Sequence, residues 1–139
     1  MGVEVKFEVT DKTDKCLNEI TNSVISWLEE AKDLVSSQAS LNSPVDTGAL
    51  SRSFLTDSFV DTAEKVAYVG SSLEYAIWQE FGTGEYALNG NGRKGGWCYI
   101  GTDGQKHFTH GVHPQRMLYS AVNSCQSLIS AKLQEILSR

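Results

Sequence analysis

The chain has 139 residues, 40 % of them hydrophobic, and a formal net charge of −5 at pH 7. This length accommodates one compact domain with its own core and is too short for two, so we expect a single domain over residues 1–139. The apolar fraction excludes wholesale disorder. The negative charge argues against a surface that holds nucleic acid through its phosphates, although it is compatible with a channel through which DNA slides.

The cysteines predict free thiols rather than a disulfide framework or a zinc site. Cys16, Cys98 and Cys125 are odd in number, widely spaced and include no CxxC pair. The N-terminal residues lack the apolar segment of a signal peptide, and no run is long enough to span a bilayer. We therefore expect synthesis in a reducing cytoplasm and no contact with a membrane.

The first forty residues show two different periodicities. Residues 3–9 alternate between apolar and charged side chains, which predicts a half-buried strand. Asp11 and Thr13 then offer caps for a helix. The helix is expected because apolar residues recur at three- and four-residue steps along one stripe, namely Leu17, Ile20, Val24, Trp27, Ala31 and Leu34.

Residues 43–50 read Ser-Pro-Val-Asp-Thr-Gly-Ala-Leu and predict a capped short helix. The Asp46 carboxylate can accept the free amide hydrogens of the first turn. Val45 before the cap and Leu50 within the helix fit a hydrophobic staple. We interpret this segment, which includes Pro44 and Gly48, as a structural motif and not as a catalytic site.

The middle of the chain predicts a hairpin, a short helix and a loop. Residues 54–60 and 64–70 carry apolar and β-branched side chains around a polar break at residues 61–63, which is typical of a hairpin. Residues 73–81 place aromatic side chains at three-residue steps, as in a short helix that ends at Gly82. Six glycines between residues 82 and 96 indicate a long mobile loop of the kind that carries function.

A second hairpin is predicted around Asp103-Gly104, a strong signal for a two-residue turn. That turn pairs Tyr99 with Phe108, Ile100 with His107, and Trp97 with His110. Pro114 suits the first position of a last long helix. The whole order predicts an α+β domain, in which an antiparallel sheet of about four to five strands is packed by two long helices plus short helices.

Three histidines are the best candidates for a metal site. His107, His110 and His113 form an HxxHxxH pattern, which would support an alternative function as a metal-dependent hydrolase. However, a spacing of three does not keep side chains on one face of a strand, and the predicted register points His107 and His110 to opposite faces. No motif such as HExxH accompanies them. We therefore predict no metal, no cofactor and no enzymatic activity.

Other patterns have simpler structural explanations. The two Gly-x-Gly stretches at residues 82–84 and 90–92 do not continue into a phosphate-binding motif. Asp46, Glu74 and Glu80 could be drawn as paired carboxylates, but helix caps and solvated faces explain them more simply. No nucleophile elbow indicates Ser–His–Asp or Cys–His catalysis.

The loop and the second hairpin carry a modest basic cluster of Arg93, Lys94 and Lys106. It leaves contact with nucleic acid or with an acidic partner open. A solvated loop is the simpler interpretation.

Several short segments together resemble one known family. They are residues 43–50, then Val69-Gly70-Ser71 with Tyr75-Ala76, then Glu80-Phe81-Gly82-Thr83-Gly84, and finally Pro114-Gln115-Arg116-Met117-Leu118 with Ala121. Their order resembles the minor head–tail joining family of long-tailed bacteriophages, whose members are described as neck, tail-completion, tail-component or minor capsid proteins. The resemblance spans roughly residues 1–138. Residues 113–117 depart from the family pattern, and the segment between Gly84 and Trp97 shows no pattern that matches it.

The resemblance implies a non-enzymatic subunit of the head–tail connector (neck) ring of a siphovirus. Such a subunit joins the head-closure complex to the tail and keeps the DNA channel continuous. A tail terminator ring that caps the tail tube is the alternative. The implied location is the virion neck, after assembly in the host cytoplasm.

The implied partners follow from that role. They are further copies of the chain in a hexameric or dodecameric ring, the head-closure or adaptor protein, and the tail terminator or tail tube protein. Double-stranded DNA would pass through the lumen without sequence-specific binding. The predicted interface combines exposed aromatic anchors with the glycine-rich loop, and its residues are Tyr75, Trp78, Phe81, Gly82, Gly84, Arg93, Lys94 and Trp97.

Overall fold

A computed structural model describes the backbone of residues 2–44 and 48–138 and the side chains of residues 14–44 and 48–138. Its elements are the helices α1 (Gly2–Asn42), α2 (Ala49–Thr56), α3 (Ala76–Phe81) and α4 (Met117–Leu137), the 3-10 helix η1 (Gly84–Tyr86), and the strands β1 (Phe59–Asp61), β2 (Val66–Tyr68), β3 (Trp97–Ile100) and β4 (Lys106–Thr109). No helix in the described part of the chain is long and apolar enough to cross a membrane.

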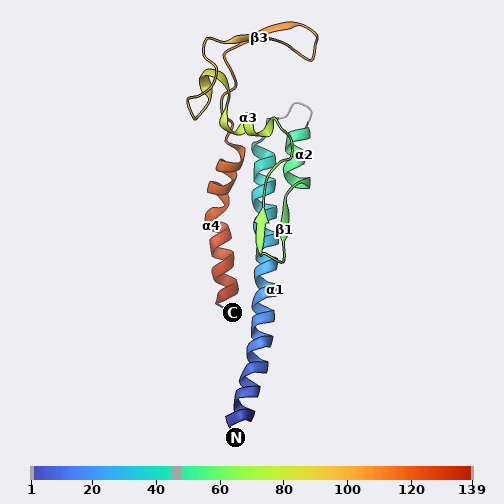
Figure 1. Ribbon diagram of the computed structural model, residues 1–139, viewed down its shortest axis with the longest axis vertical. Helices are drawn as coiled ribbons and strands as arrows, with labels where there is room; N and C mark the ends of the chain where they lie inside the picture. The colour runs from blue at the N-terminus through green and yellow to red at the C-terminus, as the bar shows by residue number, and fades with distance from the viewer. Residues whose placement is uncertain (1, 45–47, 139) are drawn as a thin grey trace.

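The two long helices α1 and α4 run antiparallel along the long axis of the molecule (Figure 1). The Trp27 indole donates a hydrogen bond to the Ile129 carbonyl over 2.9 Å near one end of the pair. Near the other end, the Asn42 side-chain amide donates to the Met117 carbonyl over 3.2 Å. This register places the end of α4 opposite about residue 20 of α1. The N-terminal part of α1 therefore extends beyond its partner helix.

The strand expected at residues 3–9 is wrong, because α1 already begins at Gly2. The expected caps at residues 11 and 13 accordingly lie inside the helix. A strand needs a neighbour to satisfy its backbone groups, and the described strands lie elsewhere along the molecule (Figure 1). Extending an existing helix satisfies those groups locally and needs no new nucleus. The alternating pattern is therefore overridden by the absence of a pairing edge.

The core is small and lies where α1, α2 and α4 meet. Phe54 and Met117 are its largest fully buried side chains. The other buried members of the cluster are Val35, Ala39, Leu50, Ala121 and Cys125. Leu50 of the predicted structural motif is thus a core residue. Pro44 is exposed just after α1, where a proline is compatible with the end of a helix.

Only part of the predicted motif at the start of α2 lies within the described residues. Gly48 stands at the N-cap position with a left-handed φ of 79°, and α2 begins at Ala49. The predicted cap by Asp46 and the staple by Val45 lie outside the described residues. They stay predictions.

The sheet prediction is wrong in strand number and connection. Each hairpin forms its own two-stranded antiparallel sheet, β1 with β2 and β3 with β4, instead of one sheet of four to five strands. The β1–β2 hairpin lies along α1, whereas the β3–β4 hairpin lies beyond α3 at the far end of the molecule (Figure 1). The fold is still α+β. Residues 54–56, expected in the first strand, belong to α2 because Phe54 turns into the core.

The register of the β3–β4 hairpin differs by one residue from the prediction. The observed pairs are Trp97 with Thr109, Cys98 with Phe108, Tyr99 with His107, and Ile100 with Lys106. The cause is the turn, because the Gly101 amide donates to the Gln105 carbonyl and three residues lie between them. Gly104 takes the left-handed conformation, with φ 77°, that ends a three-residue hairpin loop.

Candidate interaction surface

Glu80 is the buried link between α3 and α4. Its side chain is 6 % exposed, and its carboxylate accepts hydrogen bonds from the backbone amides of Leu118 at 2.9 Å and Tyr119 at 3.1 Å. Both amides belong to the first turn of α4, where amide hydrogens lack helical partners and a negative charge is favourable. A residue from another helix therefore caps α4.

The prediction that Pro114 takes the first position of the last helix is wrong. The proline does not open the last helix, which begins at Met117 after Arg116 in the left-handed conformation. Instead, the chain after Pro114 is held against the end of α3, since the Gln115 amide donates to the Gln79 carbonyl over 2.7 Å. Glu80, and not Pro114, therefore defines the start of α4.

The outer side of α3 is aromatic and apolar. Trp78 is 56 % exposed, and Tyr75, Ile77 and Phe81 are exposed beside it. The Arg116 guanidinium lies over the Phe81 ring, 5.6 Å from its centroid. The structure thus brings together three of the predicted interface residues, with Trp78 and Phe81 on α3 and Tyr75 at its N-cap. Sequence reasoning missed Ile77, which the same exposed face contains.

An apolar hollow of about 320 Å³ adjoins this helix. We call it the α3 hollow. Its floor includes the buried Phe54 and Met117, and its rim includes the exposed Ile77 and Phe81. Gly70 and Ser71, from the segment that follows β2, also line it. The α3 hollow is an opening in the surface directly above the core.

The loop after α3 is tied to the segment before α4. The Thr83 amide donates to the Val112 carbonyl and the Glu85 amide to the His110 carbonyl, both over 2.9 Å. Gly82 and Gly84 adopt left-handed φ angles of 77° and 61°. A side chain at Gly84 would collide with the His110 carbonyl. These two glycines serve local backbone packing, while the mobility of residues 82–96 stays a prediction.

The remaining predicted interface residues lie at the base of the β3–β4 hairpin. The Arg93 guanidinium lies 5.6 Å from the Trp97 ring centroid, and Lys94 is exposed next to it. Trp97 is half-buried, and its ring lies close to Gly84. The predicted residues therefore form two groups on consecutive parts of the molecule, one on α3 and one at the hairpin.

The three histidines each have a separate partner. His107 lies 3.0 Å from the Asp103 carboxylate, and His110 lies 3.2 Å from that of Glu85. The His113 ring stacks on Tyr86 with 3.8 Å between centroids. Among the described residues, no group of three side chains is arranged to hold a metal ion. Hydrogen bonds from the Gln105 amide and from His107 lower the pKa of Asp103.

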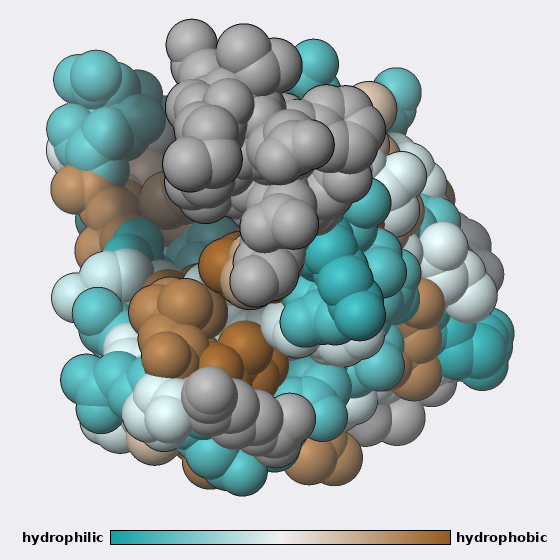
Figure 2. Space-filling view, turned by 90° about the horizontal axis from the view of Figure 1, so that it is seen from below, coloured by the Kyte–Doolittle hydropathy of each residue, from teal (hydrophilic) through white to brown (hydrophobic). Residues whose placement is uncertain are grey.

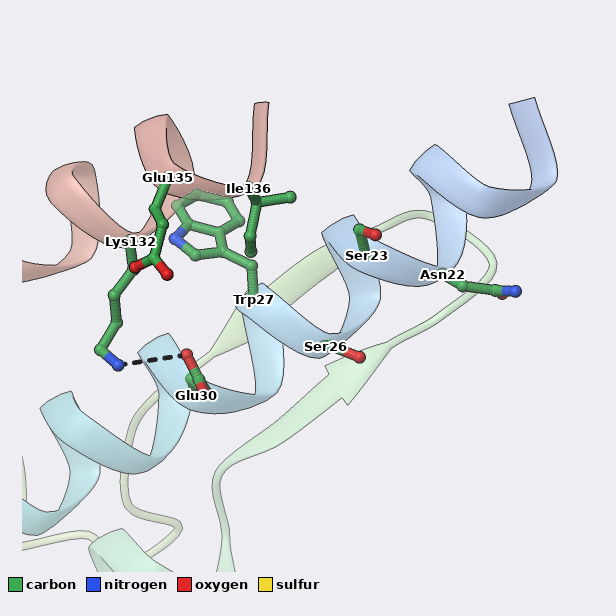
Figure 3. Close-up of a pocket in the computed structure, with 8 residues that line it drawn as sticks. All are labelled: Asn22, Ser23, Ser26, Trp27, Glu30, Lys132, Glu135 and Ile136. Carbon is green, nitrogen blue, oxygen red and sulfur yellow. Dashed lines mark ion pairs between the residues drawn. The ribbon is translucent and has the colours of Figure 1, made fainter. Parts of the chain in front are cut away.

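A more polar pocket between α1 and α4 belongs to the helix pairing (Figure 3). The Trp27 ring of α1 lies between the two helices and Ile136 of α4 borders it, as Figure 3 shows. Lys132 of α4 reaches Glu30 of α1 at 3.4 Å. These contacts hold the two helices together, so we assign this pocket a structural role.

Part of the chain is similar in sequence to a known protein family. A family model described as "Bacteriophage HK97-gp10, putative tail-component" matches residues 7–82, which is more than half of the chain. The match includes the segment at 43–50 and all of α3. No curated protein and no solved structure gave a match. The chain therefore belongs to the HK97 gp10-like family of bacteriophage tail components.

Proposed function

We propose that the chain is a structural subunit of the head–tail connector ring, the neck, of a tailed bacteriophage. Membership of a phage tail-component family supports a role in the virion. The finer assignment to a ring rests on the surface of the isolated chain. In this role, the subunit joins the head-closure complex to the tail around the channel through which DNA passes.

The observation that carries this proposal is an excess of exposed surface. The chain exposes 9712 Å², whereas a compact monomer of 15.3 kDa exposes about 7,100 Å². A ring subunit contacts two neighbours, and a standard interface buries about 800 Å² on each partner. The excess of roughly 2,600 Å² is therefore sufficient for two such contacts and for further contacts with adjoining rings.

The exposed surface also has the composition of an interface. Large apolar side chains remain exposed on α3, on the β3–β4 hairpin and along α1 and α4. Seen from below relative to Figure 1, apolar residues reach the surface among hydrophilic ones (Figure 2). Aromatic residues such as Trp78 are typical anchors of protein–protein contacts. The net charge of −5 suits a lumen that lets DNA slide.

Phage particles that lack this protein test the proposal. We expect DNA-filled heads and separate, finished tails of normal length, and we expect the intact gene supplied in trans to restore joining. Tails of irregular length would instead identify a tail terminator ring. If tails still join full heads without the protein, the proposed function is wrong.

A further inference from the structure

We propose that the β3–β4 hairpin of one copy docks on the α3 hollow of a second copy and so forms the contact between ring neighbours. This inference rests on the proposed ring function and specifies which surfaces make the ring. It concerns residues 97–109 on one side and α3 with its hollow on the other.

The hairpin presents one apolar face that the chain itself does not cover. In the observed register, Cys98 and Phe108 are paired and share a face with Ile100 and Lys106. Ile100 is 68 % exposed and Phe108 is 60 % exposed. An apolar face of this kind on a protruding hairpin is expected to be covered by another surface.

The opposite face of the hairpin is occupied by its own side chains. It contains Trp97, under the Arg93 guanidinium, and Tyr99, whose ring stacks on that of His107 at 5.5 Å. Trp97 and His107 are half-buried, in contrast to Ile100 and Phe108 on the other face. The less protected face is therefore the apolar one.

A site of matching character lies elsewhere on the same chain. The α3 hollow is apolar and opens between Ile77 and Phe81. The hairpin extends away from the paired helices beyond α3 (Figure 1), and within the described residues no hydrogen bond or ion pair joins β3 or β4 to α3. One chain thus carries a projecting apolar face and a receiving apolar hollow. A contact between two different patches of identical chains is heterologous and repeats around a ring.

The charges of the two surfaces are complementary. Residues 93–109 carry three basic side chains and one acidic side chain, a net charge of +2. Beside the α3 hollow, the Asp57 carboxylate is bonded to Ser72 and Glu74 is exposed just before α3. The Arg116 guanidinium over Phe81 offsets one of these two negative charges. Lys106 stands on the apolar face itself. Opposite charges around an apolar contact favour the second copy in one orientation.

Disulfide cross-linking in assembled particles tests the contact. The variant Ile77→Cys, in a Cys16→Ser background, places a thiol at the rim of the hollow while the natural Cys98 stays on the hairpin. Under mild oxidation, we expect most of the chain to migrate on a non-reducing gel as a ladder of multimers, since every copy links to the next.

Two controls separate this contact from chance collisions. Leu137→Cys in the same background places an exposed thiol at the end of α4, far along the helix from α3, and we expect no ladder from it. Ile77→Cys with Cys98→Ser should also give none.

The possible failures are distinguishable. The docking contact is overturned if joined particles contain the chain but give no ladder. It is also overturned if Leu137→Cys gives an equal ladder, or if the product contains a different phage protein. These three outcomes leave the ring function standing. If the chain is missing from finished particles, the proposed neck function falls. The cross-link is then read on the purified full-length chain, where its absence overturns the contact.

Discussion

At the scale of single residues, the most informative side chain is Glu80. Sequence reasoning explained it as a cap or a solvated carboxylate, and the structure makes it a cap for a helix that begins 37 residues later. The local sequence contains no signal for this partner, because the contact depends on how α3 crosses α4. The family resemblance at residues 80–84 includes Glu80 but does not indicate that its carboxylate bonds to α4.

Replacing Glu80 tests this link. Glu80→Ala leaves two amides of α4 without their acceptor and is expected to lower the free energy of unfolding by about 1–3 kcal/mol. Glu80→Gln keeps one acceptor oxygen and should lose less. Urea unfolding measures both, with the exposed Glu74→Ala as the control. An equal effect of Glu80→Ala and Glu74→Ala would contradict the capping role.

Two glycines allow backbone strain to be separated from close packing. Gly84 and Gly90 both have left-handed φ angles, but a side chain at Gly84 meets the His110 carbonyl whereas the space at Gly90 is open. We expect Gly84→Ala to lower the free energy of unfolding by about 1–3 kcal/mol more than Gly90→Ala. Thermal or urea unfolding decides, and equal losses would show that residues 110–112 do not pack on Gly84.

Acid sensitivity is expected at Asp57. The Ser72 backbone amide and hydroxyl hold the pKa of Asp57 below its usual value. A carboxyl whose pKa falls on folding stabilises the folded state above its unfolded pKa, and this stabilisation is lost as the pH falls through the folded pKa. Urea midpoints followed downward from about pH 5 should therefore fall less in Asp57→Asn than in the wild type. Parallel curves would refute the assignment, and Glu74→Gln is the control.

At the scale of elements, the helices and both hairpins could be predicted largely from periodicity and turn residues. The helical stripe from Leu17 to Leu34 lies in α1, and α3 ends at Gly82 as expected. The strand at residues 3–9 was wrong because alternation alone does not supply a pairing partner. The hairpin register was wrong by one residue because Asp103-Gly104 forms part of a three-residue loop. That single step decides which side chains share the exposed face.

The unequal lengths of α1 and α4 predict unequal stability along α1. Residues 27–42 pack on α2 and α4, whereas the helix before about residue 20 has no helix beside it among the described residues. Native-state hydrogen exchange on the dilute, unassembled chain should show protection close to global unfolding only in the packed part. Uniform protection from residue 14 to residue 42 would contradict this arrangement.

At the scale of the whole molecule, the chain has a small core and a large exposed apolar surface. A core made chiefly of α1, α2 and α4 leaves the outer side of α3 and one face of the β3–β4 hairpin without cover from the same chain. Composition did not reveal this, because 40 % hydrophobic residues is an ordinary value for a globular protein. The aromatic side chains predicted as anchors on α3 are exposed in the structure. The exposed apolar face of the hairpin could not be predicted, because the predicted strand register was wrong by one residue.

The central claim is that this surface is covered by neighbours in a ring at the phage neck. A reconstruction of the head–tail junction of intact particles by electron cryomicroscopy tests it most directly. We expect a closed ring of this chain around the DNA channel, with α3 of each copy covered by the next. A neck whose density contains no copy of this chain, or a single uncovered copy, would contradict the account.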